Sequence, residues 1–183
     1  MDVIEKALKT AAKAHEKQYR KGTDIPYVTH PIAVGMILIK AGYSDELVAA
    51  GILHDTVEDT DLSLQDIEQL FGKSIADIVE GCSEPDKSLT WEERKADTIE
   101  YLKTAPEKIR VVACADKLHN IQSIASDIEQ FGDQVWEKFN RGKEKQKWYY
   151  TSVIESLDYQ SSFPLLDKLK VSVKRLFKSN YEE

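Results

Sequence analysis

The sequence predicts an all-α protein, a bundle of roughly 8–10 helices. Apolar residues recur at helical spacing along most of the 183 residues. The 8 glycines and 5 prolines fall between these periodic segments, where they act as helix ends and turns. A chain of this length suits one domain with a sizeable core, so it needs no disulfide or metal to stay folded.

The N-terminal helices are bounded by ordinary start and stop signals. A helix is predicted over 2–19 with one apolar stripe, and a loop over 20–29 follows it. Pro31 suits the first turn of a helix that ends near Gly42. Ser44 is a suitable N-cap for the next helix, which is apolar nearly all round and is therefore expected to be buried.

Two capping boxes and a proline indicate the middle helices. Ser63 with Asp66 resembles one capping box, and Thr90 with Glu93 resembles another. Pro106 can open the long apolar helix that comes next. The β-branched residues of that segment leave a strand open as an alternative, but no partner strand is evident, so we favour a buried helix.

The C-terminal third predicts two more helices, over 133–157 and 164–178. Their tryptophans and tyrosines are expected to pack the helices onto the core rather than to bind a cofactor. The last helix is amphipathic and basic. We favour packing on the core or on a second subunit over a role at a membrane surface.

Composition narrows the functional classes. The net charge of −7 argues against a dedicated nucleic-acid binder, and an anionic ligand would need local cations or a metal. Cys82 and Cys114 are expected to be buried thiols in a reducing compartment. No signal segment and no apolar run near about 18 residues is present. We therefore expect a cytoplasmic protein that does not bind membranes.

Polar groups follow apolar runs at three places. His54 and Asp55 follow one buried-looking helix, Asp116 follows another, and His30 precedes Pro31 at a helix start. Burying such groups is costly unless something neutralises them. Two imidazoles and two carboxylates suit a divalent transition ion such as Mn²⁺ or Fe²⁺. Zinc remains possible, although thiolate ligands are absent. We call His30, His54, Asp55 and Asp116 the His/Asp quartet.

Neighbouring residues supply further candidates. Helical spacing places Glu58 one turn beyond His54, where it can act as a base or orient a water. His119 faces about 100° away from Asn120 on a helix, so we expect it to support or pack rather than to ligate. His15 lies among charged residues and is expected at the surface.

These motifs resemble a known family. The quartet matches the H…HD…D signature of HD-domain metal-dependent phosphohydrolases. Four segments look like the hydrolase domain of RelA/SpoT-type alarmone enzymes, and the resemblance covers about residues 11–124. The segments are YRK at 19–21, PYVTHP at 26–31, LHDTVEDT at 53–60 and ADKLHN at 115–120.

The resemblance implies an activity and a set of roles. The quartet would bind one Mn²⁺, and the enzyme would remove the 3′-pyrophosphate of (p)ppGpp, the alarmone of the stringent response, to give GDP or GTP. Glu58 and Asp59 would serve the attacking water. Arg20 and Lys21 would contact the nucleotide, and Asn120 would lie by its guanine-ribose end.

The residues themselves agree with these roles. A guanidinium plane can stack on a base, and an ammonium can meet a phosphate. Three further cations could offset the acidic net charge near the site: Arg94, Lys95 and Lys117.

The chain also departs from the family. Gln122 stands where relatives often have arginine, and residues 80–87 (EGCSEPDK) differ from the GVTKL-like segment of the long enzymes. Nothing after residue 124 resembles a synthetase. We therefore expect one hydrolase domain over 1–183, with its site within 11–124 and C-terminal helices within 133–178.

Two competing functions remain open. One is an HD-domain phosphohydrolase acting on another nucleotide or a phosphomonoester. The other is a nucleotide-sensing module that binds without turnover. The expected partner is a guanine nucleotide, with a homo-oligomer also possible.

Overall fold

The computed structural model describes residues 2–84, 88–139 and 141–178. Within these ranges it contains helices and no β-strand, which confirms the all-α prediction. In chain order the helices are α1 Val3–Ala14, α2 Thr29–Lys40, α3 Asp45–Leu53, α4 Thr56–Asp59, α5 Leu64–Phe71, α6 Lys73–Cys82, α7 Trp91–Thr104, α8 Glu107–Phe131, the 3₁₀ helix η1 Gly132–Lys138, α9 Gly142–Asp158 and α10 Pro164–Phe177.

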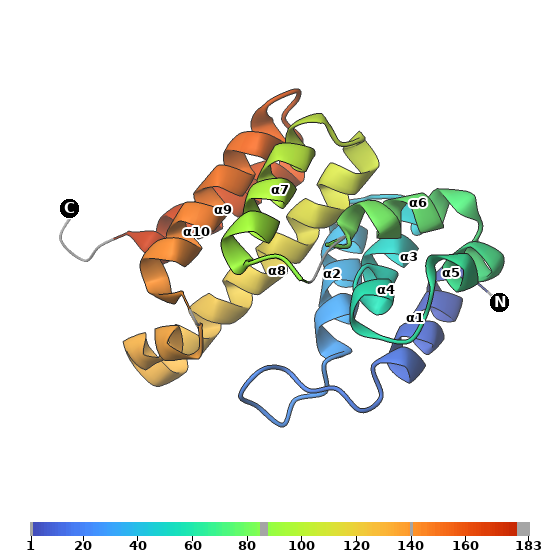
Figure 1. Ribbon diagram of the computed structural model, residues 1–183, viewed down its shortest axis with the longest axis horizontal. Coiled ribbons are helices and arrows are strands. Elements are labelled where there is room, and N and C mark those ends of the chain that lie inside the picture. The colour runs from blue at the N-terminus through green and yellow to red at the C-terminus, as the bar shows by residue number, and fades with distance from the viewer. Residues whose placement is uncertain (1, 85–87, 140, 179–183) are drawn as a thin grey trace.

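The long helix α8 separates two groups of helices. Figure 1 shows α1 to α6 on one side of α8, and α7, α9 and α10 on the other. Helix α8 packs against α2, α3 and α6 in the first group and against α10 in the second. Side chains on α8 can therefore meet residues from both groups.

Helix α3 is the centre of the first group. All its residues from Leu47 to Leu53 are buried, as its apolar sequence predicts. It crosses α2 at two glycines. A Cβ atom on Gly51 would lie 2.5 Å from Leu38 Cδ1, and one on Gly35 would lie 2.6 Å from Ile52 Cγ1. This close approach brings the start of α2 beside the end of α3.

The first helix is shorter than predicted. It ends at Ala14, not near Tyr19, so the prediction of a helix over 2–19 is wrong in its last residues. Tyr19 instead pairs with Pro26 in an isolated antiparallel bridge. Main-chain hydrogen bonds from Arg20 N to Ile25 O (2.8 Å) and from Tyr27 N to Gln18 O (2.8 Å) close the loop.

The prediction that His15 lies at the surface is also wrong. His15 is only 1% exposed, and its Nδ1 lies 2.7 Å from Gln18 Oε1. Its ring centroid lies 4.9 Å from that of Tyr27. The shortened helix turns the chain back over this imidazole, which an extended surface helix would have left in water.

The middle helices begin as predicted. Both capping boxes are present, at Ser63 and at Thr90. Pro106 precedes α8, and the β-branched run lies inside α8, so the alternative of a strand is excluded.

The C-terminal third differs from its prediction in one place. The single helix expected over 133–157 is two helices, η1 and α9. Gly132 and Gly142 have φ values of 71° and 66°, in the left-handed region that glycine adopts readily. The turn at Gly142 therefore divides the segment where one helix was predicted, and the turn at Gly132 separates η1 from α8.

A buried arginine ties the last helices to α8. Arg110 is 1% exposed; it donates to the main-chain oxygen of Leu157 and to that of Ser161 at 2.6 Å. The apolar side of α10 is buried, as the preferred packing interpretation predicts. No helix in the described ranges is long and apolar enough to cross a bilayer.

Candidate active site

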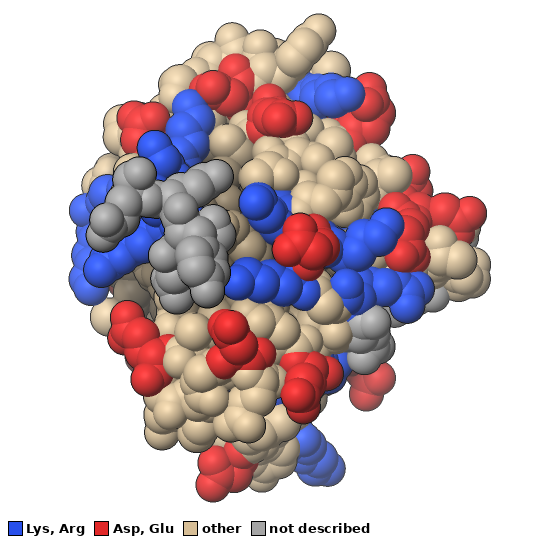
Figure 2. Space-filling view, turned by 90° about the vertical axis from the view of Figure 1, so that its left-hand side faces the viewer, with Lys and Arg blue, Asp and Glu red and all other residues tan. Residues whose placement is uncertain are grey.

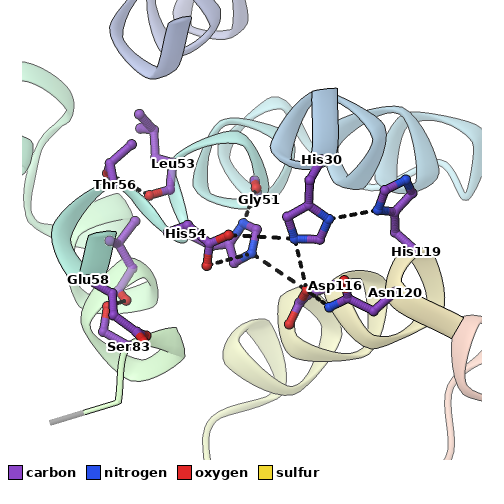
Figure 3. A network of polar contacts seen from close by, with 12 residues as sticks. His30, Gly51, Leu53, His54, Thr56, Glu58, Ser83, Asp116, His119 and Asn120 are labelled. Carbon is purple, nitrogen blue, oxygen red and sulfur yellow. Dashed lines mark hydrogen bonds and ion pairs between the residues drawn. The ribbon is translucent and has the colours of Figure 1, made fainter. Parts of the chain in front are cut away.

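The structure brings the His/Asp quartet together from three places in the fold. His30 Nε2 lies 3.1 Å from Asp116 Oδ1 and 3.5 Å from Asp55 Oδ2. His54 Nε2 lies 3.1 Å from Asp55 Oδ1 and 3.7 Å from Asp116 Oδ1. Figure 3 shows His30, His54 and Asp116 pointing toward one another from α2, from the end of α3 and from α8.

A turn lets two adjacent residues share the site. Helix α3 ends at Leu53 and α4 begins at Thr56, so His54 and Asp55 form the turn between them. In one continuous helix, neighbouring side chains point about 100° apart. Helical spacing alone therefore did not predict the direct contact between His54 and Asp55.

The buried His54 imidazole has the character of a metal ligand. Its Nδ1 lies 2.7 Å from Gly51 O, and a carbonyl only accepts hydrogen bonds, so Nδ1 carries the proton. In the neutral ring, Nε2 then carries the lone pair. It is buried, has no hydrogen-bond partner and faces two carboxylates. One donor atom each from His30, His54 and Asp116 lie within 4.8 Å of one another, a spacing that a single divalent ion can satisfy.

The electrostatics of the quartet also favour a cation. Burial alone would lower the pKa of His54, but the charges of Asp55 and Asp116 outweigh burial and raise it well above its ordinary range. Burial would raise the pKa of Asp55, yet His54 beside it holds that pKa well below its usual range. A site that pulls a proton so strongly onto a buried imidazole can exchange that proton for a divalent metal.

His119 lies behind the quartet. Its Nδ1 is 2.7 Å from His30 Nδ1, on the side of the ring away from the carboxylates. Burial, followed by the neighbouring His30 and Arg20, lowers the pKa of His119 to about 4. A neutral His119 can accept a proton donated by His30 Nδ1, leaving His30 Nε2 free to ligate.

Three other side chains hold the two carboxylates. The Tyr27 hydroxyl donates to Asp55 Oδ2 at 2.5 Å. Lys117 Nζ donates to Asp116 Oδ2 at 2.6 Å, and Asn120 Nδ2 donates to Asp116 Oδ1 at 2.7 Å. Sequence reasoning missed Tyr27; its only signal was its place in the PYVTHP segment. Asn120, expected at the nucleotide, contacts the quartet directly.

The quartet opens into a cavity of about 610 Å³ that we call the acidic chamber. Among the described residues, its walls carry many more carboxylates than cations. The carboxylates are Asp55, Glu58, Asp59, Asp77, Glu80, Glu84, Asp97 and Asp116.

A second cavity of about 490 Å³ adjoins the first, and we call it the basic chamber. Its described walls combine cations with aromatic rings, in contrast to the acidic chamber. The cations are Arg20, Lys21, Lys95, Lys117 and Lys138; the aromatic residues are Tyr27, Trp91, Phe139, Tyr149 and Tyr150.

The two chambers share a wall. It consists of Arg20, Tyr27, Lys95, Lys117, Asn120 and Tyr149. Tyr149 comes from α9, so the C-terminal helices contribute to the cavity. Figure 2 shows that cations also gather on the surface despite the acidic net charge, in a band across the middle of one face.

Helix α4 presents the candidate water-handling pair. Glu58 is half-buried, and its Oε2 accepts the main-chain N–H of Glu84 at 3.0 Å. Burial raises the pKa of Glu58, and the nearby acids Glu84 and Asp59 add to this, although the Glu84 N–H acts in the opposite direction. Asp59 is exposed at the edge of the acidic chamber.

The predicted cations are present, and several are already paired. The Arg20 guanidinium lies 5.8 Å from the Tyr27 ring centroid, and Lys21 lines the basic chamber. Arg94 and Lys95 both contact Glu84. Of residues 80–87, which depart from the family segment, only those up to Glu84 lie within the described residues.

An all-α fold that gathers two imidazoles and two carboxylates from α2, from the turn after α3 and from α8 defines the class of HD-domain proteins. The HD-domain family matches residues 7–144, and the chain belongs to this family.

Particular relatives narrow the resemblance. The chain is 39% identical over 128 residues to the bifunctional (p)ppGpp synthase/hydrolase SpoT of Escherichia coli; the match covers 67% of this chain but only 18% of that protein. It is 38% identical over 125 residues to the guanosine-3′,5′-bis(diphosphate) 3′-pyrophosphohydrolase MESH1 of Danio rerio, covering 67% of this chain and 69% of the relative.

A solved structure extends the similarity over nearly the whole chain. It is that of a metazoan ortholog of SpoT that hydrolyses ppGpp. It superimposes with a TM-score of 0.79 at 29% identity, covering 96% of this chain and 95% of the other. The similarity therefore includes the C-terminal helices.

Proposed function

We propose that this protein is a metal-dependent hydrolase that removes the 3′-pyrophosphate of (p)ppGpp, giving GDP or GTP and pyrophosphate. The proposal rests chiefly on one observation. The buried His54 Nε2, without a hydrogen-bond partner, faces two carboxylates at the end of a cavity that continues into a basic, aromatic chamber. The ppGpp-hydrolysing activities named for the Danio rerio relative and for the metazoan protein of the solved structure support the choice of substrate.

The His/Asp quartet is the proposed ligand set, and Mn²⁺ is the proposed ion because imidazole and carboxylate share the ligation. When bound, a divalent ion supplies a water of lowered pKa and offsets charge on the phosphoryl oxygens. Tyr27, Lys117 and Asn120 orient the carboxylates, and His119 sets the tautomer of His30.

Glu58 and Asp59 are the proposed proton-handling residues. Water adds to the phosphorus attached to the ribose 3′ oxygen, and the bond between that phosphorus and the 3′ oxygen breaks. Glu58, with its raised pKa, is suited to take the proton from the water. The 3′ oxygen takes up a proton as it leaves, and Asp59 lies at the chamber edge where it can serve that step.

The basic chamber is the proposed place for the remainder of the nucleotide. Arg20 can stack on the base, and Lys21 can meet a phosphate. Asn120 lies in the wall between the two chambers and would face the guanine-ribose end while holding Asp116. We also propose that residues 1–183 form one domain and that the protein is cytoplasmic; a homo-oligomer remains a hypothesis.

The test is turnover by the purified full chain. With Mn²⁺ present, ppGpp should yield GDP and pyrophosphate, chelation should stop the reaction, and Asp55→Ala should abolish it. Asp24→Ala, an exposed acid in the loop before α2, is the matched control and should leave turnover unchanged.

A substrate panel separates the alternatives. Cleavage of another nucleotide or a phosphomonoester, with ppGpp untouched, would favour a different HD-domain phosphohydrolase. Binding of ppGpp without cleavage in metal-loaded protein would favour a sensing module. Either result contradicts the proposed function.

A further inference from the structure

Glu84 is an acid in a site proposed to take an anionic substrate. It lines the acidic chamber, its side chain is 14% exposed, and it stands in the segment that departs from the family pattern. Its Oε1 lies 2.5 Å from Lys95 Nζ, and its Oε2 lies 2.5 Å from Arg94 Nη1. One carboxylate therefore bridges two cations of α7.

The two cations differ in their access to the cavities. Lys95 lines both the acidic and the basic chamber, whereas Arg94 lines neither. Lys95 Nζ also lies 5.0 Å from the ring centroid of Tyr149 in the shared wall. Lys95 is therefore the cation that a phosphate in the cavity would meet, and Glu84 already holds it.

Glu84 is charged in this position. Burial would raise its pKa, but the hydrogen bond and charge of Lys95, together with Arg94 and Lys117, hold that pKa below its usual range. Its main-chain N–H donates to Glu58 Oε2 at 3.0 Å, so Glu84 stands between the cations and the proposed base.

We propose that Glu84 is a residue that sets the affinity for anions: its carboxylate occupies an anion position at Lys95, so that a substrate phosphate binds there only by displacing it. This rests on the proposed function for its substrate. Arg94 lies outside the cavities and can keep the displaced carboxylate paired, which makes the exchange possible without leaving a buried charge alone.

The exchange has a definite sign. A competing carboxylate weakens the binding of anions, because one negative charge must leave Lys95 before another arrives. Removing only the charge of Glu84 should therefore strengthen anion binding. A residue that merely supported the site would have the opposite effect when changed.

The test is Glu84→Gln, which keeps the main-chain N–H and the shape of the side chain. In the full chain loaded with Mn²⁺, the Kd of inorganic pyrophosphate, measured by calorimetry, should fall about five- to tenfold, and the KM for ppGpp should fall similarly. The effect should shrink at high salt. Asp97→Asn removes an exposed carboxylate on the same helix and the same chamber, and should change the Kd by less than about twofold.

A double-mutant cycle assigns the effect to Lys95. In a Lys95→Met background, Glu84→Gln should change the pyrophosphate Kd by no more than about twofold. Circular dichroism establishes that each variant is folded. Weaker or unchanged binding in Glu84→Gln, or an undiminished effect without Lys95, would overturn the proposal.

The outcome is separable from the fate of the proposed function. Pyrophosphate binding needs no turnover. If the wild-type protein leaves ppGpp intact but Glu84→Gln still binds pyrophosphate more tightly, the proposed substrate is wrong and the proposed role of Glu84 stands. If the wild-type protein hydrolyses ppGpp but Glu84→Gln does not bind pyrophosphate more tightly, the proposed function stands and the proposed role of Glu84 is wrong.

Discussion

The acidic and the basic chamber share one wall, yet they differ in charge and in the source of their residues. The acidic chamber contains the His/Asp quartet and is lined largely by residues from α3 to α8. The basic chamber takes its cations and aromatic rings from the loop before α2 and from α7, α8, η1 and α9. One cavity suits a cation, and the other suits the anionic and aromatic parts of a nucleotide.

This difference answers the question posed by the net charge. A protein with a charge of −7 repels a highly phosphorylated ligand at long range. The division into chambers places the carboxylates where they attract a metal and the cations a few ångströms away. Changes to the His/Asp quartet or to Glu58 should therefore affect bound metal or kcat, whereas changes to the cations that face the nucleotide should affect KM.

The largest effect is expected from Asp116→Asn. Asp116 Oδ1 faces both imidazoles, so losing its charge should remove bound Mn²⁺ and lower kcat by about 10³-fold or more. Metal analysis after dialysis and a turnover assay measure both. Asp77→Asn, an exposed acid of the same chamber paired with Lys73, should change neither. If Asp116→Asn retained one equivalent of Mn²⁺, the assignment of the metal to the His/Asp quartet of the acidic chamber would be contradicted.

Glu58→Gln should separate metal binding from proton transfer within the acidic chamber. Glu58 lies outside the quartet, so Mn²⁺ content should match that of the wild type. The loss of a base should lower kcat about 10²- to 10³-fold. Glutamine can still accept the Glu84 N–H, so the loop should keep its position. Loss of metal in this variant would show that Glu58 belongs with the ligands.

His119→Leu should weaken the binding of Mn²⁺ although it changes none of the proposed metal ligands. Without its partner at Nδ1, His30 loses the contact that sets its tautomer, and the Kd for Mn²⁺ should rise about 10- to 100-fold. At saturating Mn²⁺, kcat should return to within about threefold of the wild type. Gln122→Ala, one turn along α8, serves as the control. A kcat that metal cannot restore would argue for a direct role of His119.

Arg20→Met addresses the basic chamber. We expect KM for ppGpp to rise about tenfold with kcat and Mn²⁺ content nearly unchanged, because the guanidinium binds the nucleotide and not the metal. Steady-state kinetics with metal analysis test this. Lys17→Met, an exposed cation outside both chambers, should leave KM unchanged. A fall in kcat with constant KM would remove the distinction between the chambers.

The smallest effect concerns pH. Glu58 must be ionised to accept a proton, so activity should fall as pH drops through its raised pKa. The charge of Glu84 contributes to that raised pKa, so Glu84→Gln should move the acid limb of the profile to lower pH. Profiles of kcat at saturating Mn²⁺ measure the shift. An acid limb that moved to higher pH would exclude Glu58 as the base.

Much of the fold could be predicted from local signals. The capping boxes at Ser63 and Thr90 and the apolar run of α3 are properties of short segments, and all three were predicted as the structure has them. The break between η1 and α9 was missed because Gly142 adopts a left-handed conformation that its neighbours do not announce. The burial of His15 depends on a loop that folds back, which helical periodicity does not encode.

The candidate site divides in the same way. The quartet could be predicted from the sequence because its polar residues directly follow or precede apolar helical runs, where burial requires a partner such as a metal. Their order along the chain also matches the H…HD…D signature. The contacts of Tyr27 and Glu84 could not be predicted from the sequence, because each joins segments that meet only in the folded chain. Residues that are far apart in the sequence can pair without any characteristic spacing along the chain.

The crossing of α2 and α3 has a consequence for variation in this protein. The two helices touch where Gly35 and Gly51 lack side chains, and the imidazoles of His30 and His54 lie just beyond, with ring centroids 5.3 Å apart. The side chains of Ile52 and Leu38 pack into the space left at Gly35 and Gly51, and this packing lets α2 and α3 lie close together. A methyl group added at either glycine would meet the end of one of these side chains, which would have to move. Such a change would disturb the packing beside the two imidazoles with every polar residue still in place, so a survey of sequences for intact ligands would not register it.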